Sequence, residues 1–215
     1  SFRDGALIEP LAVAMHGINQ SRVQAGESAL IMGAGPIGLC ALVGLRYRGI
    51  DDVVVVDRSA HRLSLARELG AQSTCHVGED DVASTLKRLH GESAVMGSPV
   101  PATDVYLEAT GAGPALLQAI ELARANATVV VLGVHQSPIE FHPLTLLIKE
   151  LRLVGSMAYP EEFPQVIAML ASGDIDLGPL VTHHFPLEHF MDALATARDP
   201  QRAAKVMIRV DSAGS

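Results

Sequence analysis

Residues 28–38, Ser-Ala-Leu-Ile-Met-Gly-Ala-Gly-Pro-Ile-Gly, decide the fold of this chain. An apolar run of strand length ends in the pattern Gly33-x-Gly35-x-x-Gly38. The residues from Pro36 onward continue as a helical pattern, and proline is well tolerated in the first turn of a helix. Because a strand, a glycine-rich turn and a helix follow one another, the motif has the context that dinucleotide binding requires. An ordinary strand-to-helix turn is the alternative interpretation.

The three glycines of this motif have separate tasks. The first makes the tight turn, the second lets a pyrophosphate approach the backbone, and the third lets helix and strand pack closely. The start of the helix also offers free N–H groups and a partial positive charge to a phosphate. The residues expected to bind the phosphates are therefore Gly33, Gly35, Pro36, Ile37 and Gly38.

Strand-length apolar runs alternate with helical patterns from residue 28 to residue 157. This alternation predicts an α/β fold with a parallel sheet that is covered on both faces. Among the topologies with right-handed crossovers we favour the doubly wound order 3-2-1-4-5-6. The expected strands are 28–34, 52–57, 73–77, 105–109, 128–134 and 152–157, the expected helices are 36–48, 59–69, 80–90, 114–124 and 143–150, and 91–101 is expected to be loop.

After Met157 the pattern changes. Apolar residues at helical spacing predict amphipathic helices over residues 163–171 and 187–195, and residues 205–210 are expected to form a last strand.

Asp57 ends the second predicted strand, 19 residues after Gly38. A carboxylate at this place binds the ribose hydroxyls of NAD and repels the 2′-phosphate of NADP. A helix cap is the simpler role for an aspartate here, and the two roles are compatible. Arg58 is expected to soften the discrimination against NADP, and Arg62 either reaches the adenosine or lies on a solvated helix face.

Composition excludes several classes of protein. The 215 residues carry 16 Lys and Arg against 24 Asp and Glu, a net charge of −8, so we expect no nucleic-acid partner. No apolar run approaches the length of a membrane span, so no membrane partner is expected. The two cysteines, Cys40 and Cys75, lie in apolar segments, so we expect them to be buried, free thiols. Free thiols are typical of a reducing compartment, and we therefore expect a cytoplasmic location.

Several segments together resemble the zinc-dependent medium-chain dehydrogenases, and the polyol, butanediol and threonine dehydrogenases most of all. The resemblance covers essentially the whole chain and is far more specific than any single motif. The segments that carry it are 6–14 (ALIEPLAVA), 33–38, Asp57, 68–71 (ELGA), 108–111 (EATG), 131–133 (VLG), 149–151 (KEL) and 204–207 (AKVM).

The resemblance implies a division of the chain. Residues 21–157 would be the NAD-binding domain, and residues 1–20 and 158–215 would belong to, or bridge to, a zinc-binding catalytic domain that is not in this sequence. Because the chain also begins without Met, we expect it to be the second half of such an enzyme and inactive alone. The catalytic residues are then mostly unknown. Glu9 would bind the zinc or its water, or would simply be favoured at a helix start.

The resemblance also implies further cofactor contacts, near the ends of later strands. Lys205 would face the pyrophosphate, or would be a surface lysine on the last strand. His135 follows the expected nicotinamide strand and is a candidate ligand contact, but we assign no metal to the histidines. The other implied cofactor residues are Thr110, Gly111, Leu132, Gly133, Val134, Ser156 and Met157.

The first hypothesis is an NAD-dependent, zinc-dependent oxidoreductase that oxidises a small secondary alcohol, such as a polyol or vicinal diol, to a ketone. Alternatives are a zinc-free NADPH reductase of the quinone type, a non-catalytic nucleotide-binding module and an S-adenosylmethionine methyltransferase. The sixth strand, Arg152–Met157, is expected at the sheet edge, where it would join copies of the chain into a homodimer or tetramer.

Overall fold

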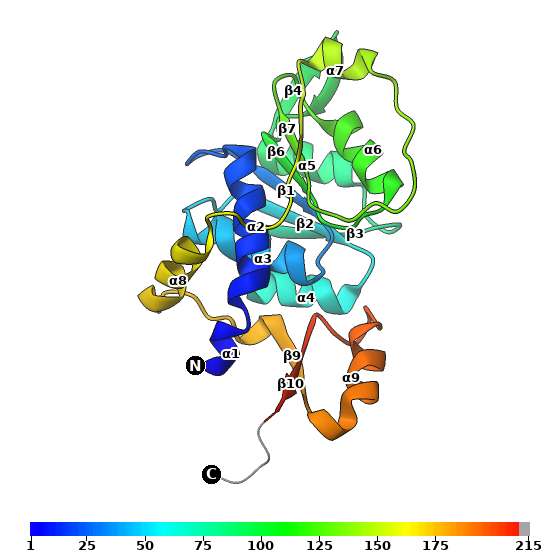
Figure 1. Ribbon diagram of the computed structural model, residues 1–215. Helices are drawn as coiled ribbons and strands as arrows, with labels where there is room; N and C mark the ends of the chain where they lie inside the picture. Colours follow the sequence, from blue (N-terminus) through cyan, green and yellow to red (C-terminus); the bar gives the residue numbers. More distant parts are fainter. Residues whose placement is uncertain (211–215) are drawn as a thin grey trace.

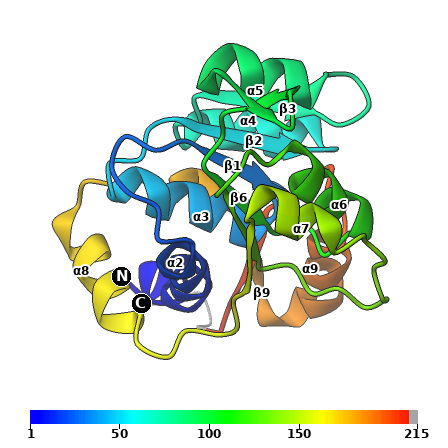
Figure 2. The ribbon, with the colours of Figure 1, turned by 90° about the horizontal axis from the view of Figure 1, so that it is seen from above.

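The computed structural model describes residues 1–210 and is built around a parallel sheet of six strands in the order β3-β2-β1-β6-β7-β8. Helices cover both faces of this sheet (Figures 1 and 2). The doubly wound order predicted from the sequence is therefore confirmed. The strands are β1 (Ala29–Met32), β2 (Val53–Asp57), β3 (Ser73–His76), β6 (Val105–Glu108), β7 (Thr128–Val131) and β8 (Arg152–Gly155).

The helices fall into two layers that pack on opposite faces. Along β1, Ala29 and Ile31 point to one face, whereas Leu30 and Met32 point to the other, as the alternation of a strand requires. The first face carries α2 (Ile8–Ser21), α3 (Pro36–Tyr47), α4 (Ala60–Glu68) and α8 (Phe163–Ser172). The second carries α5 (Val82–His90), α6 (Gly113–Leu122) and α7 (Leu144–Lys149).

The C-terminal part forms a small unit of its own below the sheet (Figure 1). Its two parallel strands, β9 (Val181–Pro186) and β10 (Lys205–Arg209), are joined through α9 (Phe190–Ala197). The expected helices after Met157 and the last strand are thus present. The short helices α1 (Phe2–Gly5), η1 (Gly178–Leu180) and η2 (Leu187–His189) complete this region.

Helix α2 was not predicted. Its buried residues include Leu11, Ala12, Met15 and Ile18, and it packs between α3, the sheet and α8. Leu11, Met15 and Ile18 recur at i, i+4 and i+7, the spacing of one helical face, so the sequence does carry a helical signal here that was overlooked. Residues 8–21 therefore contribute to the core of the sheet, while the division of the chain at residue 21 stays a prediction.

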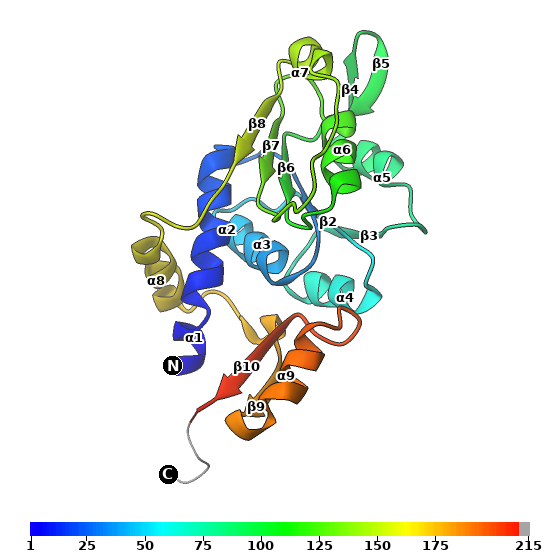
Figure 3. The ribbon, with the colours of Figure 1, turned by 45° about the vertical axis from the view of Figure 1, so that its right-hand side comes forward.

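The prediction of a loop over residues 91–101 was wrong. This segment forms an antiparallel hairpin of β4 (Glu92–Val95) and β5 (Ser98–Pro101), which lies beside α7 (Figure 3). Met96 and Gly97 connect the strands with φ angles of 50° and 82°. Two residues with positive φ form the type I′ turn that suits a two-residue hairpin. The prolines of β5 made this segment look like a loop in the sequence, because proline is rare within strands.

Strand β8 lies at the edge of the sheet, with β7 as its neighbour. This confirms its expected place. No helix among residues 1–210 is long and apolar enough to cross a membrane.

Candidate functional site

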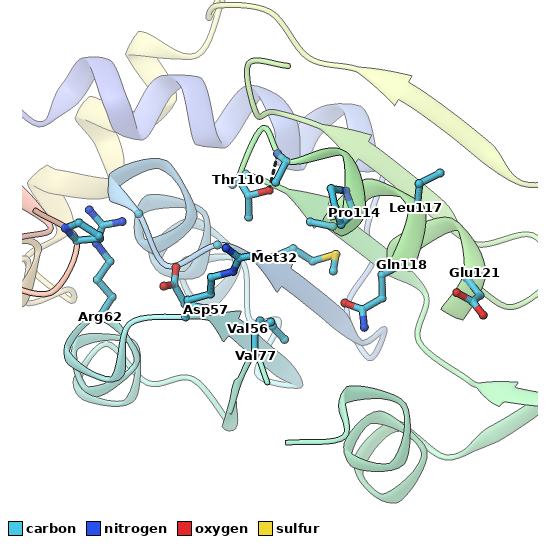
Figure 4. A pocket seen from close by; sticks show the side chains of 17 residues that line it. Met32, Val56, Asp57, Arg62, Val77, Thr110, Pro114, Leu117, Gln118 and Glu121 are labelled. Carbon is cyan, nitrogen blue, oxygen red and sulfur yellow. Dashed lines mark hydrogen bonds between the residues drawn. The ribbon is translucent and has the colours of Figure 1, made fainter. Parts of the chain in front are cut away.

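A cleft of about 750 Å³ opens at the carboxyl ends of β1, β2 and β6. Strand order reverses between β1 and β6, and crevices at such a point are where parallel α/β sheets bind ligands. Asp57 and Arg62 border one side of this cleft, and Thr110 and Pro114 border the other (Figure 4). The cleft brings together the predicted site residues Gly33, Gly35, Asp57, Arg58, Arg62 and Thr110.

Two of the motif's glycines are required by the packing of the chain itself. Gly33 has a φ of 100°, and a Cβ there would lie 2.8 Å from Cγ2 of Thr110. A Cβ on Gly38 would lie only 1.7 Å from the carbonyl oxygen of Gly33. These positions therefore hold α3 against the turn, as the first and third glycines of such a motif should.

Gly35 is different, because nothing in the protein crowds it. The nearest atom to a Cβ at this position would be Nη1 of Arg62, at 3.7 Å. Its backbone is extended, with a φ of −71°, so any residue is conformationally acceptable there. The missing side chain leaves open space in the cleft, as the close approach of a ligand requires.

Gly35 is also the N-cap residue of α3 and offers no side chain to the first turn. Pro36 has no N–H, and the N–H groups of Ile37 and Gly38 lie in the first turn, where the helix itself supplies no acceptor. The positive end of the helix dipole lies at the same point. This combination suits a phosphate group.

The carboxylate of Asp57 is fixed in place by two backbone groups. Its Oδ2 accepts a hydrogen bond of 2.6 Å from the N–H of Ala34, and its Oδ1 accepts one of 2.8 Å from the N–H of Ser59. Each carboxylate oxygen can accept a further hydrogen bond. Asp57 therefore connects the glycine turn to α4 and still presents acceptors at the cleft.

The loop between α9 and β10 closes the outer side of the cleft. The sequence analysis did not predict this contact. Ser59 Oγ donates a hydrogen bond of 2.7 Å to the carbonyl of Pro200, and Arg62 Nε donates one of 3.0 Å to that of Ala203. Pro200 itself lines the cleft. Arg62 is thus held beside Gly35 and is not on a solvated face.

The loops after β6 and β7 pass very close to each other. A Cβ on Gly111 would lie 2.6 Å from the carbonyl oxygen of Val134, and a Cβ on Gly133 would lie 2.1 Å from the nitrogen of Gly111. Gly111, Val134 and His135 line a second cleft, of about 510 Å³. Leu132, in contrast, turns away and meets Gly17 of α2.

A buried carboxylate that the sequence analysis did not single out lies between these loops. Glu108 ends β6, and its side chain has no exposed surface. Its Oε1 accepts hydrogen bonds from the N–H of Thr110 (2.7 Å) and that of Gly111 (3.0 Å), and from the Thr110 hydroxyl. Its Oε2 contacts Nε2 of His135 at 2.7 Å. The segment EATG indicated a motif here, but it did not indicate that the Glu108 carboxylate would bind the N–H groups of Thr110 and Gly111.

Comparison with known proteins identifies the family. Residues 36–172, more than half of the chain, match the family model described as zinc-binding dehydrogenase. The chain belongs to the zinc-binding dehydrogenase family. Sorbitol dehydrogenase of Rattus norvegicus is 35% identical over 211 residues, which cover 98% of this chain and 57% of that protein.

Solved structures agree with this assignment. The structure of 2R,3R-butanediol dehydrogenase from Bacillus subtilis superposes with a TM-score of 0.87 at 29% identity, over 98% of this chain and 58% of that one. A putative zinc-binding dehydrogenase from Sinorhizobium meliloti, solved bound to NADP, has a TM-score of 0.79 at 29% identity, over 95% and 58%. This zinc-binding dehydrogenase chain thus spans rather more than half the length of these relatives.

Five cofactor residues expected from the resemblance lie outside both clefts, and two of them are Leu132, which meets Gly17, and Gly133, which packs against Gly111. Met157 is 86% exposed, and Ser156 follows β8 at the sheet edge. Lys205 lines a different cleft, together with Arg3 and Arg209. Their roles in this zinc-binding dehydrogenase stay predictions.

The described residues do not form a complete zinc site. Glu9 is exposed in the first turn of α2, which agrees with the simpler interpretation of a residue favoured at a helix start. Residues 1–210 contain no cluster of three or more His, Cys, Asp or Glu side chains that could hold a metal ion. A zinc ion in this zinc-binding dehydrogenase would therefore need ligands from beyond the described residues.

Proposed function

We propose that this chain is the NAD-binding part of a zinc-dependent dehydrogenase that oxidises a secondary alcohol, such as a polyol or vicinal diol, to a ketone. The fixed carboxylate of Asp57 beside the open Gly35 is the observation that carries this proposal. Two hydroxyl donors of an adenosine ribose suit its free acceptor positions, whereas a 2′-phosphate would meet its negative charge. The relatives named as sorbitol and butanediol dehydrogenases support the substrate class.

The chain's own residues would hold NAD in three parts. Asp57 binds the adenosine ribose, with Arg58 and Arg62 beside it, and the start of α3 at Gly35 binds the pyrophosphate. The nicotinamide half extends across the switch point to the loops after β6 and β7. When bound, NAD accepts a hydride from the carbon that carries the hydroxyl group. The protein's task is to position the ring.

The zinc site and the catalytic groups would lie mostly outside the described residues. Glu9 is the residue of this chain that would approach the zinc or its water. Residues 21–157 would form the cofactor domain, and residues 1–20 and 158–215 would belong to, or bridge to, a catalytic domain. The 215-residue chain alone is then inactive as a dehydrogenase while still binding NAD.

Two other functions make different predictions. A zinc-free NADPH reductase requires a site that binds the 2′-phosphate of NADPH, and the negative charge of Asp57 would repel that phosphate. A non-catalytic nucleotide-binding module would bind NAD and stay inactive when joined to the remaining part of the protein. The activity of the complete protein toward polyols therefore separates the module from the enzyme.

Copies of the chain are proposed to pair through β8, as a dimer or within a tetramer. The free edge of β8 and the exposed Leu147 and Ile148 of α7 support this. The cytoplasm is the proposed location. Both thiols are free and buried, which fits a reducing compartment.

Titration of NAD and NADP into the purified chain by calorimetry tests the cofactor assignment. We expect the chain to prefer NAD, and Asp57→Gly to shift the ratio of the two affinities toward NADP by about tenfold or more. Asp51→Gly, at the opposite end of β2 and 72% exposed in its side chain, is the matched control and keeps the ratio. Equal or tighter binding of NADP by the unaltered chain would contradict the proposal.

A further inference from the structure

The pair of Glu108 and His135 has a chemical consequence at the second cleft. Three donors converge on Oε1 of Glu108, which accepts from the N–H groups of Thr110 and Gly111 and from the Thr110 hydroxyl. An ionised carboxylate can only accept hydrogen bonds. Nε2 of His135, 2.7 Å from Oε2, must therefore carry the hydrogen.

This fixes the tautomer of the neutral imidazole. In a neutral ring with hydrogen on Nε2, the other nitrogen, Nδ1, is an acceptor. Within residues 1–210, Nδ1 of His135 makes no hydrogen bond, and this atom is not fully buried. The side chain is 13% exposed and lines the second cleft. His135 thus presents an acceptor of defined position to that cleft.

The ligand group that reaches this acceptor follows from the topology and rests on the proposed function. With the ribose at Asp57 and the pyrophosphate at Gly35, the second half of a dinucleotide must cross from β1 toward β6 and β7. We propose that His135 Nδ1 accepts a hydrogen bond from the carboxamide N–H of the nicotinamide. Glu108 is then the positioning residue that sets the tautomer.

Three ligands separate this contact from its alternatives. NAD has the carboxamide, 3-acetylpyridine adenine dinucleotide has the same carbonyl and ribose without the N–H, and ADP-ribose has no ring. His135→Gln keeps an N–H donor for Glu108 and removes the acceptor at Nδ1. We expect it to weaken NAD binding by about three- to tenfold and to leave the binding of the other two ligands unchanged.

The controls distinguish this inference from the proposed function. His142→Gln alters an exposed histidine of the same segment and should leave all three affinities as they are. If His135→Gln weakens NAD and the acetylpyridine analogue equally, a ribose hydroxyl or the loop shape is responsible, and the inference is wrong. If the unaltered chain binds neither NAD nor ADP-ribose, the proposed function itself fails.

The tautomer can be observed without any ligand. Nitrogen-15 NMR of the imidazole should show hydrogen on Nε2 of His135 in the unaltered chain. In Glu108→Gln the amide nitrogen would occupy the place of Oε2 and donate to Nε2, which moves the ring hydrogen to Nδ1. Glu140→Gln, an exposed acid of the same segment, leaves the spectrum unchanged. An Nδ1–H tautomer in the unaltered chain would overturn the inference even if the Glu108 variant does not fold.

Discussion

Replacing Gly35 by valine should remove NAD binding without unfolding the protein. A Cβ at this position meets no protein atom closer than 3.7 Å, and the φ of −71° suits a residue with a side chain. The fold loses only the modest advantage of glycine over valine as an N-cap residue, so the free energy of unfolding should fall by no more than about 1 kcal/mol.

The loss of binding should be much larger than the loss of stability. The valine would occupy the space through which a pyrophosphate approaches the N–H groups of Ile37 and Gly38. Each hydrogen bond to a charged group contributes about 1.5–3 kcal/mol, so losing one weakens binding by about 10- to 150-fold. Losing two would put binding beyond ordinary calorimetry.

Calorimetric titration with NAD and thermal unfolding of the same samples test this prediction. Gly5→Val is the matched control, because a Cβ at Gly5 also meets nothing within 4 Å but lies at the end of α1, outside the cleft. We expect the control to bind NAD like the unaltered chain. A Gly35→Val protein that keeps its NAD affinity and a normal melting temperature would refute the assignment of the phosphate site.

Three further predictions concern stability and assembly. Gly38→Ala should lower the melting temperature strongly, because its Cβ would lie 1.7 Å from a backbone oxygen; an unchanged melting curve would contradict this. The N–H groups of Arg152 and Ser156 face β7, whereas the N–H of Gly155 points to the free edge of the sheet. Gly155→Pro should therefore leave the sheet intact, remove a donor from the edge and split a dimer measured by light scattering. Persistence of the dimer would place the interface elsewhere. Burial lowers the pKa of His90, so the unfolded chain binds a proton more readily than the folded chain, and stability should be lost as the pH falls below about 6.5. In urea unfolding between about pH 7 and 5, His90→Gln should make the free energy of unfolding depend less on pH. An equally steep dependence in this variant would refute the prediction.

The sequence was sufficient for the sheet and for one half of the site. The central strands β1, β2, β6 and β7 are almost wholly buried and mostly apolar, so their order and direction followed from simple rules. The edge strands β3 and β8 are only partly buried and carry polar residues. Gly33, Gly35 and Asp57 line the cleft, and local spacing alone predicts that they meet there. These features depend on neighbours in the sequence.

Features that depend on distant contacts were not predictable in the same way. The docking of Pro200 onto Ser59 joins residues 141 apart, and no local pattern marks either partner. The contact between His135 and Glu108 joins the ends of two neighbouring strands, 27 residues apart. Topology predicts that such ends meet, but not which side chains bond.

Mapping of NAD contacts by NMR tests the central claim most directly. In nitrogen-15 spectra of the purified chain, titration with NAD should shift the backbone amides of residues 33–38, Asp57 and the loops at 109–112 and 132–135. The cleft between the β4–β5 hairpin and α7, which contains Met96 and Ile148, should show no shifts. Shifts confined to that other cleft, or no shifts at millimolar NAD, would contradict the account.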